Sequence, residues 1–450
     1  MAAAPIGQTH RVQPVPEDPW PAPQARRPVD AVVAVPGSKS MTNRALVLAA
    51  LASGASTIRR PLRARDTLLM AGALRALGVR VGDDGDDDWR VEPAALRGPA
   101  TVDVGNAGTV LRFLPPVAAL AAGPVRFDGD PRVRERPIAP LLGALRELGA
   151  ELDDGGRGAL PITVRGTGRL AGGATTIDAS SSSQLVSGLL LAAPRYDKGL
   201  LLRHAGPPVP SGLQLALTVQ MLRDAGAAVA EQSTSDGHEW TVEPGQLSPV
   251  DRVVAPDLST AAPFAAAALV AGGRVRVPGW PARAYQPGDR LPELLTRMGG
   301  RCELTAQGLT VTGPGPGGLS GIDADLSDCG ELTPVLAAVA ALAGTPSTLR
   351  GVAHLRGQET DRLAALATEL TALGGQVSET ADGLRIVPRP LHAGVFETYH
   401  DHRLAMAAAV LGLAVPGLAV RNVATTGKTI PDFPARWSAM LAVTATATSE

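Results

Sequence analysis

The sequence has few cysteines, few aromatic residues and no long apolar segment. Two cysteines in 450 residues cannot build a framework of disulfide bonds. Aromatic residues make up 3% of the chain, and 42 Lys and Arg nearly balance 43 Asp and Glu, which disfavours nucleic-acid binding by a basic surface with stacking rings. The longest apolar stretches, 261–270 and 334–343, are shorter than the ~20 residues that cross a bilayer. We therefore expect binding neither to nucleic acid nor to a membrane.

Length and composition predict a globular protein with two or more lobes, because 450 residues are about three times the ~150 residues of a typical domain. Residues 1–11 lack the apolar core of a signal peptide, so we expect a cytoplasmic location. Residues 1–28 are rich in proline and lack apolar periodicity, which predicts a disordered extension. The polar residues 444–450 predict a loose tail.

Two patterns recur along the chain with a period of about 70 residues. An apolar helix pattern that ends in small residues appears six times, for example at 51–54, 120–123 and 413–417. A second helix pattern, closed by a glycine and followed by a strand pattern, ends at Gly78, Gly149, Gly226, Gly299 and Gly374. Two patterns with one period predict six copies of an α/β unit, too long for a solenoid and therefore arranged in a symmetric globular fold.

Each copy opens with a turn of small or polar residues between a strand pattern and an Ala/Leu-rich helix. The turns lie at 35–40, 104–109, 177–184, 254–260, 322–331 and 395–403. A helix amino terminus carries unpaired amides and about half a positive charge, so such turns can bind anions. Ser, Thr, Asp and Asn are also ordinary helix caps. Basic residues beside several of the turns favour an anion receptor.

The first two turns combine glycine with basic residues. Ser40 and Arg44 are four residues apart and share a helical face beside Lys39, which suits the binding of carboxylate and phosphate groups. The order Gly-Ser-Lys lacks the earlier glycine of a Walker A loop, and a capped surface helix is the alternative. Gly108, followed by Arg112 one turn later, repeats this combination of a glycine and a basic residue.

Three further segments suggest binding or catalysis. Arginines 132, 134 and 136 alternate, which predicts one side of an extended chain or a solvated edge strand. The serines at 180–183 form a neutral anion-binding turn without the Gly-x-Ser-x-Gly pattern of hydrolases, and Ser211 opens another helix. Glu359 and Arg362 share a helical face and suit a proton donor beside a phosphate ligand, or a simple helical ion pair.

A metal centre is not expected. The sequence 400–403, His-Asp-His-Arg, resembles a metal-binding pattern, but no remote Cys/His pair completes a tetrahedral set. We therefore do not expect a metal centre.

The ordered set of motifs resembles the enolpyruvyl transferases, and in particular those that act on shikimate 3-phosphate. The matching segments lie at 36–40, 105–109, 130–138, 182–184, 359–362, 401–406 and 428–429, in family order. The resemblance implies an α/β fold of two similar lobes, each of three βαβαββ units in an inside-out barrel, with the active site in the cleft between them. The lobes would comprise 29–38 with 255–443, and 39–254.

The resemblance also implies a reaction with two substrates that needs neither a metal nor an organic cofactor. The enolpyruvyl group of phosphoenolpyruvate would move to the 5-hydroxyl of shikimate 3-phosphate with release of phosphate, in the shikimate pathway to aromatic amino acids. We expect a monomer. Shikimate 3-phosphate would contact Ser40, Arg44, Ser182, Ser183, Gln184, Ser211, Glu331, His354 and Gln358. Phosphoenolpyruvate would contact Lys39, Asn106, Gly108, Arg132, Gln184, Arg362, Arg403 and Lys428. Glu359 would protonate C3, Lys39 would polarise the reacting centre, and Glu331 would deprotonate the hydroxyl.

Some positions depart from the family pattern, and two alternative functions stand beside it. Glu331 replaces an aspartate of many members, Gln358 replaces a lysine, and Phe113 replaces a proline. A transferase acting on UDP-N-acetylglucosamine is one alternative, although the stretch between Phe113 and Arg132 lacks the cysteine many of those enzymes use. A non-enzymatic anion-binding scaffold is the other.

Overall fold

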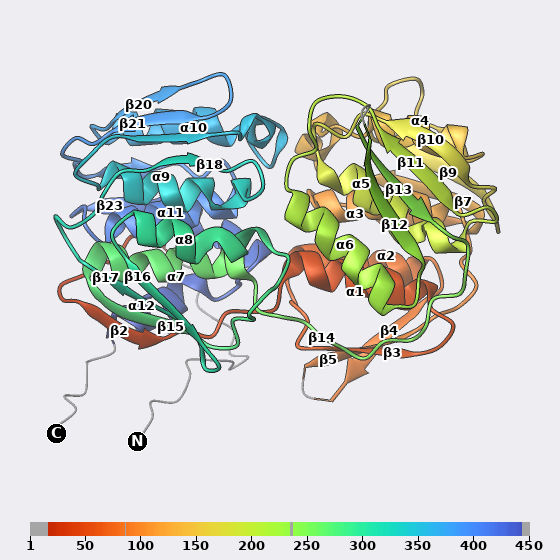
Figure 1. Cartoon of the computed structure of the whole chain (residues 1–450), viewed down its shortest axis with the longest axis horizontal. Coiled ribbons are helices and arrows are strands. Elements are labelled where there is room, and N and C mark those ends of the chain that lie inside the picture. The colour runs from red at the N-terminus through yellow and green to blue at the C-terminus, as the bar shows by residue number, and fades with distance from the viewer. Residues whose placement is uncertain (1–16, 86, 235–236, 443–450) are drawn as a thin grey trace. The chain divides into compact units, whose positions relative to one another are not determined.

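The computed structural model describes residues 17–85, 87–234 and 237–442, which belong to two compact units (Figure 1). One unit comprises Met1–Pro36 and Ala255–Glu450, and the other comprises Gly37–Val254. The chain therefore leaves the first unit shortly before the expected boundary at residue 38 and returns at residue 255. The expected tail at 444–450 and residues 1–16 of the expected extension lie outside the described residues.

The described part of the second unit contains three four-stranded sheets. The first, in the order β14-β3-β5-β4, contains β3 (Ser56–Arg59), β4 (Arg80–Asp84), β5 (Asp88–Glu92) and β14 (Arg252–Val253). The second, in the order β6-β7-β9-β8, contains β6 (Ala100–Asp103), β7 (Ala122–Asp128), β8 (Glu151–Asp153) and β9 (Ile162–Thr167). The third, in the order β10-β11-β13-β12, contains β10 (Gly173–Ile177), β11 (Leu200–His204), β12 (Val229–Thr234) and β13 (Gly237–Val242). The helices are α1 (Lys39–Leu51), α2 (Arg65–Ala76), α3 (Gly108–Ala118), α4 (Ala139–Glu147), α5 (Ser183–Ala192) and α6 (Gly212–Asp224), with the 3-10 helices η1 (Pro131–Glu135) and η2 (Ala193–Arg195).

The first unit repeats this construction in its described residues. One sheet, in the order β16-β17-β15-β2, contains β2 (Val29–Val32), β15 (Gly273–Val277), β16 (Arg301–Thr305) and β17 (Gly308–Gly313). Another, in the order β18-β19-β21-β20, contains β18 (Asp323–Asp325), β19 (Ser347–Arg350), β20 (Gln376–Glu379) and β21 (Leu384–Val387). The last, in the order β1-β23-β22, contains β1 (Trp20–Pro21), β22 (Gly394–Phe396) and β23 (Leu418–Val420). The helices are α7 (Leu258–Ala271), α8 (Leu291–Arg297), α9 (Thr333–Ala341), α10 (Arg362–Ala372), α11 (His402–Gly412) and α12 (Phe433–Ala442), with η3 (Pro287–Arg290), η4 (Gly330–Leu332), η5 (Ala353–Gly357) and η6 (Val423–Lys428).

The strand pairing follows the βαβαββ pattern. In the third sheet, β10 and β11 are parallel and joined by α5, while β11 and β12 each pair antiparallel with β13. The sheet of β18 to β21 has the same pattern with α9 and α10. The prediction of a repeated βαβαββ unit in two α/β lobes is therefore confirmed.

The innermost helices form the core of each unit. Every residue of α7, α9 and α11 is buried, and these three helices contact one another. Beyond their first residues, their Ala-rich sequences are apolar all round, as is typical of a helix without a solvent face. By contrast α10 buries one face, with Leu363, Leu366 and Leu370 at helical spacing. The three Ala-rich helices therefore lie inside the first unit, whereas α10 lies nearer its surface.

Residues 17–28 belong to the fold, which corrects the expectation of disorder for this part of the extension. Strand β1 pairs antiparallel with β23, and Trp20 is 8% exposed with its ring edge against Phe433. Proline is tolerated there because β1 lies at the edge of its sheet, where one row of N–H groups has no partner strand. Composition therefore misjudged a segment that a buried tryptophan and pairing with β23 hold in place.

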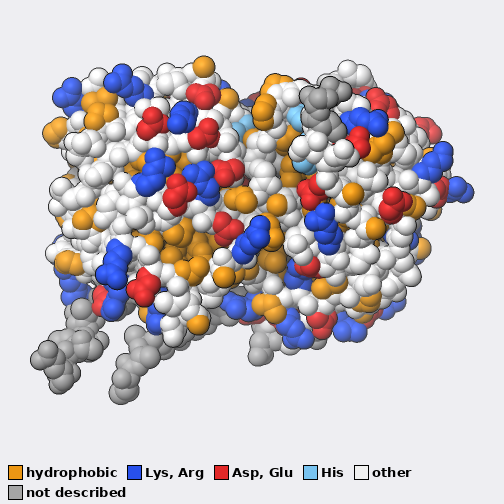
Figure 2. Space-filling model, viewed as in Figure 1, with side chains coloured by type: hydrophobic (Ala, Val, Ile, Leu, Met, Phe, Trp, Pro, Cys, Tyr) orange, Lys and Arg blue, Asp and Glu red, His pale blue; other side chains and the backbone are white. Residues whose placement is uncertain are grey.

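The surface offers no large region of one charge on the face shown in Figure 2, where acidic and basic side chains are interspersed. None of the described helices is both long and apolar enough to span a membrane.

Candidate active site

The first helix of the second unit begins at a basic residue. Ser38 caps α1 and accepts a hydrogen bond from the Met41 amide at 3.4 Å. Lys39 Nζ lies 3.3 Å from Oδ2 of Asp66, in the first turn of α2, and the two side chains are 14% and 3% exposed. The ion pair holds the ammonium group near the positive end of α1, a suitable place for an anion.

Arg44 lies deeper in the unit than the sequence suggested. It is 1% exposed, and its guanidinium donates to Thr218 Oγ1 at 2.8 Å, Ser187 Oγ at 3.2 Å and the Gln214 carbonyl at 3.1 Å. A further bond reaches the carbonyl of Ser40 at 3.0 Å. Arg44 therefore holds α1 against α5 and α6 in this structure, and a substrate carboxylate would have to replace some of these acceptors.

The second turn brings polar side chains of three segments together around Gly108. A Cβ atom at this glycine would lie 2.6 Å from Arg136 NH2, 2.9 Å from Arg112 NH1 and 3.0 Å from Gln184 Oε1. Arg136 NH1 donates to the carbonyl of Asn106 at 3.0 Å, and Arg112 NH1 donates to Gln184 Oε1 at 3.1 Å. A side chain at 108 would occupy the space beside the two guanidinium groups and force them to shift, so glycine suits their close approach to this turn.

Arg112 and Arg136 were not among the expected substrate contacts. The spacing of Arg112, one helical turn after Gly108, was the available signal for the first. The signal for Arg136 was misleading, because the alternating arginines predicted an extended chain. The segment is instead the 3-10 helix η1, which begins at Pro131.

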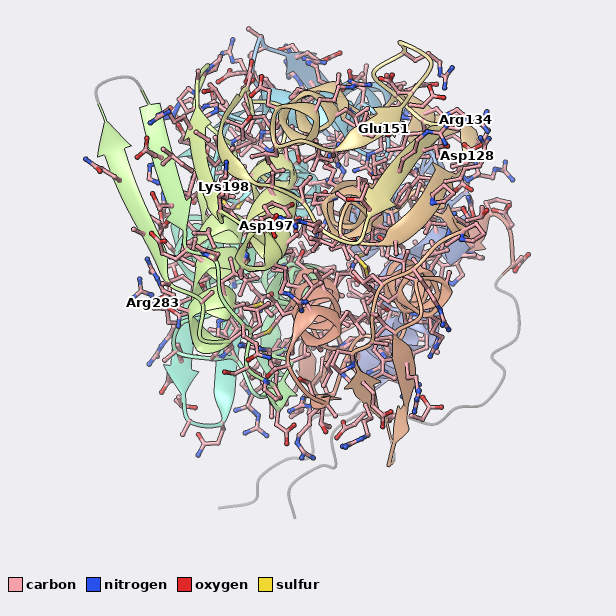
Figure 3. All side chains as sticks on the ribbon, turned by 90° about the vertical axis from the view of Figure 1, so that its right-hand side faces the viewer. Asp128, Arg134, Glu151, Asp197, Lys198 and Arg283 are labelled. Atoms are coloured by element: carbon pink, nitrogen blue, oxygen red, sulfur yellow. The ribbon has the colours of Figure 1, made fainter. Side chains whose placement is uncertain are left out.

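The three alternating arginines point in different directions, because residues two apart on a 3-10 helix do not share a face. Arg132 forms an ion pair with Glu135 at the surface. Arg134 donates to both oxygens of Asp128, at 3.0 and 3.1 Å (Figure 3). Arg136 is 4% exposed and turned inward. The expectation that the three lie on one side is therefore wrong.

The third repeat of this unit presents two adjacent helix starts rich in hydroxyls. Ser182 caps α5 and accepts from the Gln184 amide at 3.3 Å, and Ser183 is 5% exposed. Ser211 precedes α6 with a left-handed backbone (φ 58°), an unfavourable conformation for a residue with a side chain. Helices α5 and α6 contact each other, so their amino ends can serve one anion.

His204 joins the two loops that lead to these helices. Its Nδ1 lies 3.3 Å from the Ala179 amide, and its Nε2 lies 2.8 Å from the Pro207 carbonyl. The imidazole is 5% exposed. This bridge keeps the two loops at a constant separation.

The first unit contains a buried network of acids and bases from two repeats. Lys428 Nζ donates to Glu359 Oε1 at 2.5 Å, and Arg362 NH2 donates to Glu359 Oε2 at 2.9 Å. Arg362 also donates from Nε to Asp401 Oδ2 at 2.8 Å. Asp401 is fully buried and caps α11, accepting from the Arg403 amide at 2.8 Å. Charged groups in such places need partners, and each one here has them.

The network extends to Glu331. Arg403 NH2 donates to Glu331 Oε2 at 2.6 Å, and these side chains are 7% and 30% exposed. The structure therefore brings together Glu331, Glu359, Arg362, Arg403 and Lys428, which the sequence separates by up to 97 residues. Asp401 was missed as a site residue, although its position before His402 and Arg403 marked it as a helix cap.

His354 lies beside the same network on η5. A Cβ atom at Gly330 would be 2.8 Å from its Nε2. Burial lowers the pKa of His354 to about 4, the positive charge of Arg362 adds to this, and Glu331 opposes it. Gln358, partly buried, ends η5 immediately before Glu359.

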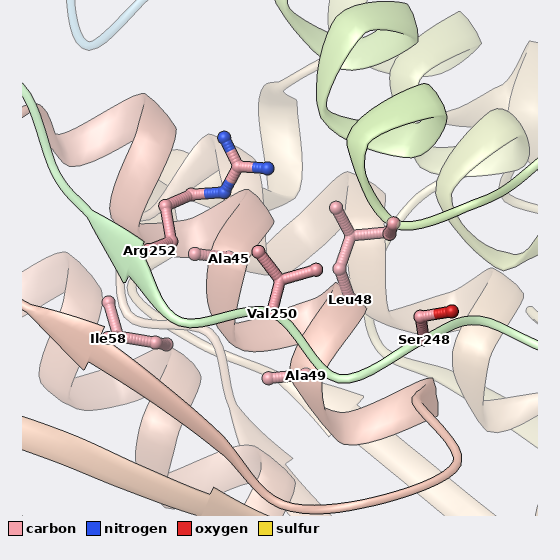
Figure 4. A pocket seen from close by; sticks show the side chains of 8 residues that line it. Ala45, Leu48, Ala49, Ile58, Ser248, Val250 and Arg252 are labelled. Atoms are coloured by element: carbon pink, nitrogen blue, oxygen red, sulfur yellow. The ribbon is translucent and has the colours of Figure 1, made fainter.

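A small pocket of the second unit lies away from these residues (Figure 4). Leu48, Ile58, Val250 and Arg252 help to line it, and none of the expected site residues does. Arg252 donates to Asp224 at 2.9 Å. Among the described residues, no group of three or more His, Cys, Asp or Glu side chains could hold a metal ion.

Basic groups at helix starts in one unit, and a buried acid paired with two cations in the other, define a protein equipped to bind and transform small anions. Residues 23–437 match the family model described as EPSP synthase (3-phosphoshikimate 1-carboxyvinyltransferase), and the chain belongs to this family. A 3-phosphoshikimate 1-carboxyvinyltransferase of Kocuria rhizophila is 52% identical over 436 residues, which cover 94% of this chain and 97% of that protein.

Solved structures share the fold. EPSP synthase from Acinetobacter baumannii superposes with a TM-score of 0.76 at 24% identity, covering 93% of this chain and 97% of that one. The enolpyruvyl transferase NikO from Streptomyces tendae superposes with a TM-score of 0.71 at 20% identity, covering 93% and 96%. The α/β fold expected from the repeats is therefore confirmed.

Proposed function

We propose that this chain transfers the enolpyruvyl group of phosphoenolpyruvate to the 5-hydroxyl of shikimate 3-phosphate and releases phosphate, as a step of aromatic amino acid biosynthesis. Family membership and the 52% identical relative support this reaction. The assignment of roles to individual residues rests on the position of Glu359, which pairs with both Lys428 and Arg362. A carboxyl group between two cations can exchange a proton with a substrate that those cations bind.

The proposed chemistry has an addition step and an elimination step. In the addition, the 5-hydroxyl oxygen bonds to C2 of phosphoenolpyruvate, its proton passes to Glu331, and the carboxyl group of Glu359 protonates C3. In the elimination, the bond between C2 and the phosphate oxygen breaks, and C3 returns its proton to Glu359. The double bond is thereby restored, and phosphate leaves with the proton that Glu331 took from the hydroxyl, so that both carboxyl groups return to their starting states.

The charges of the network suit phosphoenolpyruvate, an anion with a phosphate and a carboxylate. Arg362, Arg403 and Lys428 are balanced by Glu331, Glu359 and Asp401. When a substrate anion binds to these cations, their interaction with Glu359 weakens. The carboxylate form of Glu359 is then less stabilised, so its protonated form becomes more favourable. We assign the same substrate to Lys39, Asn106, Gly108, Arg132 and Gln184, and extend the set to Arg112 and Arg136.

We assign shikimate 3-phosphate to the hydroxyl-rich helix starts of the second unit. Ser182, Ser183 and Ser211 are proposed to receive its phosphate, because amides and hydroxyls at two neighbouring helix starts can bind an anion. Gln184 would contact the ring, and Ser40 with Arg44 the carboxylate. Glu331, His354 and Gln358 are proposed to contact this substrate from the first unit. The proposal also includes a monomeric, cytoplasmic enzyme.

The decisive experiment measures phosphate release from the purified, folded protein without added metal. Release that needs both phosphoenolpyruvate and shikimate 3-phosphate is the expected result. Phosphate release that needs UDP-N-acetylglucosamine in place of shikimate 3-phosphate would identify the sugar nucleotide as the acceptor. Binding of both substrates without any turnover would favour an anion-binding scaffold and overturn the enzymatic assignment.

A further inference from the structure

The sixth repeat is completed by the amino-terminal segment. The other sheets of the described chain each contain an antiparallel hairpin, whereas in the last sheet β1 takes this place and pairs with β23. Trp20 lies opposite Val420, and the Ala22 amide donates to the Leu418 carbonyl at 3.0 Å. A Cβ atom at Gly412 would come within 2.4 Å of that of Ala22, so the segment also packs closely on α11. Residues 17–25 thus form part of the repeat that carries Arg403 and Lys428.

Asp18 bonds to the turn that leads to Lys428. Its Oδ1 accepts from the Asn422 amide at 2.7 Å. Asn422 has a left-handed backbone (φ 54°) and stands between β23 and the 3-10 helix η6, whose last residue is Lys428. The bond to Asp18 therefore stabilises the bend by which the chain enters η6.

His400 connects the same turn to the start of α11. Its Nδ1 accepts from Asn422 Nδ2 at 2.9 Å, and its carbonyl accepts from Thr425 Oγ1 at 2.8 Å. Tyr399 and His400 are both left-handed, with φ of 51° and 58°. Two successive residues with side chains in this region are strained, and they persist only where surrounding contacts hold them. The next residue is Asp401, the buried partner of Arg362.

We propose that the hydrogen-bonded chain Asp18, Asn422 and His400 positions Lys428 relative to Arg403 and thereby sets the affinity for phosphoenolpyruvate. The three residues act as positioning residues through η6 and α11. The inference rests on the proposed function, because it assigns Lys428 and Arg403 to that substrate. It also gives the amino-terminal segment a role in the enzyme.

The test compares steady-state kinetics of Asp18→Ala and His400→Gly with the wild type. Glycine at 400 keeps the left-handed backbone and removes only the imidazole acceptor. Each variant is expected to raise the KM for phosphoenolpyruvate about tenfold, near the effect of one lost hydrogen bond, with little change in kcat or in the KM for shikimate 3-phosphate. Asp18→Asn keeps an acceptor oxygen and should restore the wild-type value. Glu17→Ala, which removes the neighbouring acid, is the matched control.

Two kinetic outcomes would overturn the inference. One is an unchanged KM for phosphoenolpyruvate in both variants, and the other is an equal rise of both KM values. Amide hydrogen exchange of residues 421–429 in the protein without substrates supplies a readout that does not depend on turnover. If the wild type does not turn over the substrates but these amides exchange faster in Asp18→Ala than in the wild type, the proposed function is refuted and the positioning role is supported. Unchanged exchange would refute the positioning role.

Discussion

Lys428 Nζ lies 2.5 Å from Oε1 of Glu359, and both side chains are only 8% exposed. The two residues come from different repeats, 69 positions apart. Arg362 bonds to the other carboxylate oxygen, so the acid sits between two cations with little access to water. This contact is the strongest structural support for an acid that works together with anion-binding groups.

Replacing Glu359 with Gln tests its role as proton donor. The amide keeps the shape but cannot donate to C3 as a carboxyl group does, so kcat should fall by roughly 10²- to 10⁴-fold. Glu379→Gln, at the surface and paired with Arg356, is the control and should keep its activity. Phosphate release and circular dichroism would be measured on both. A folded Glu359→Gln protein within tenfold of wild-type kcat would contradict the assignment.

Replacing Lys428 with Met tests the binding of phosphoenolpyruvate. The change removes a charged donor, and charge-assisted hydrogen bonds of this kind account for about 1.5–3 kcal/mol, so kcat/KM for phosphoenolpyruvate should fall roughly 10- to 100-fold. Lys198→Met, in the other unit and exposed (Figure 3), should leave it unchanged. Equal losses in the two variants would show that the effect is not specific to the site.

Replacing Arg44 with Lys should destabilise the second unit. One ammonium group cannot reach Thr218, Ser187 and the Gln214 carbonyl together, as the guanidinium does. We expect the free energy of unfolding in urea to fall by roughly 2–4 kcal/mol. Arg385→Lys, on the exposed face of β21, is the control. Stability equal to the wild type would mean that Arg44 is free to serve the substrate alone.

His354 predicts a pH dependence of stability. Its pKa is about 4 in the folded protein and near 6.5 when unfolded, so the unfolded chain binds more protons between these values. Its contribution to stability is complete above pH 6.5 and is lost as the pH falls towards 4, by at most about 3 kcal/mol. His354→Gln should therefore lose less stability than the wild type between pH 7 and pH 4.5 in urea titrations. Parallel curves for the two proteins would contradict this prediction.

The repeats were readable from the sequence because their signals are local. Each glycine expected to end a helix, at 78, 149, 226, 299 and 374, has a positive φ between 85° and 104°. Such a backbone is a property of one residue and its neighbours, so the pattern alone predicts it. The apolar helices and the capping residues Ser38, Ser182 and Asp401 can likewise be recognised from a few neighbouring residues.

Local patterns in the chain were enough to predict the six α/β repeats, the resemblance to the family and most of the residues that gather around Gly108 in one unit and around Glu359 in the other. Which side chains point inward, and what they contact, became known from the folded chain alone. Arg136 turns inward and Arg132 outward because η1 is a 3-10 helix beginning at a proline, and Trp20 anchors a proline-rich segment because a sheet edge is open to it. Arg44 donates hydrogen bonds to acceptors on α5 and α6, and Asp401 forms an ion pair with Arg362. The contacts of Trp20, Arg44 and Asp401 depend on packing between segments far apart in the chain, which no local pattern encodes.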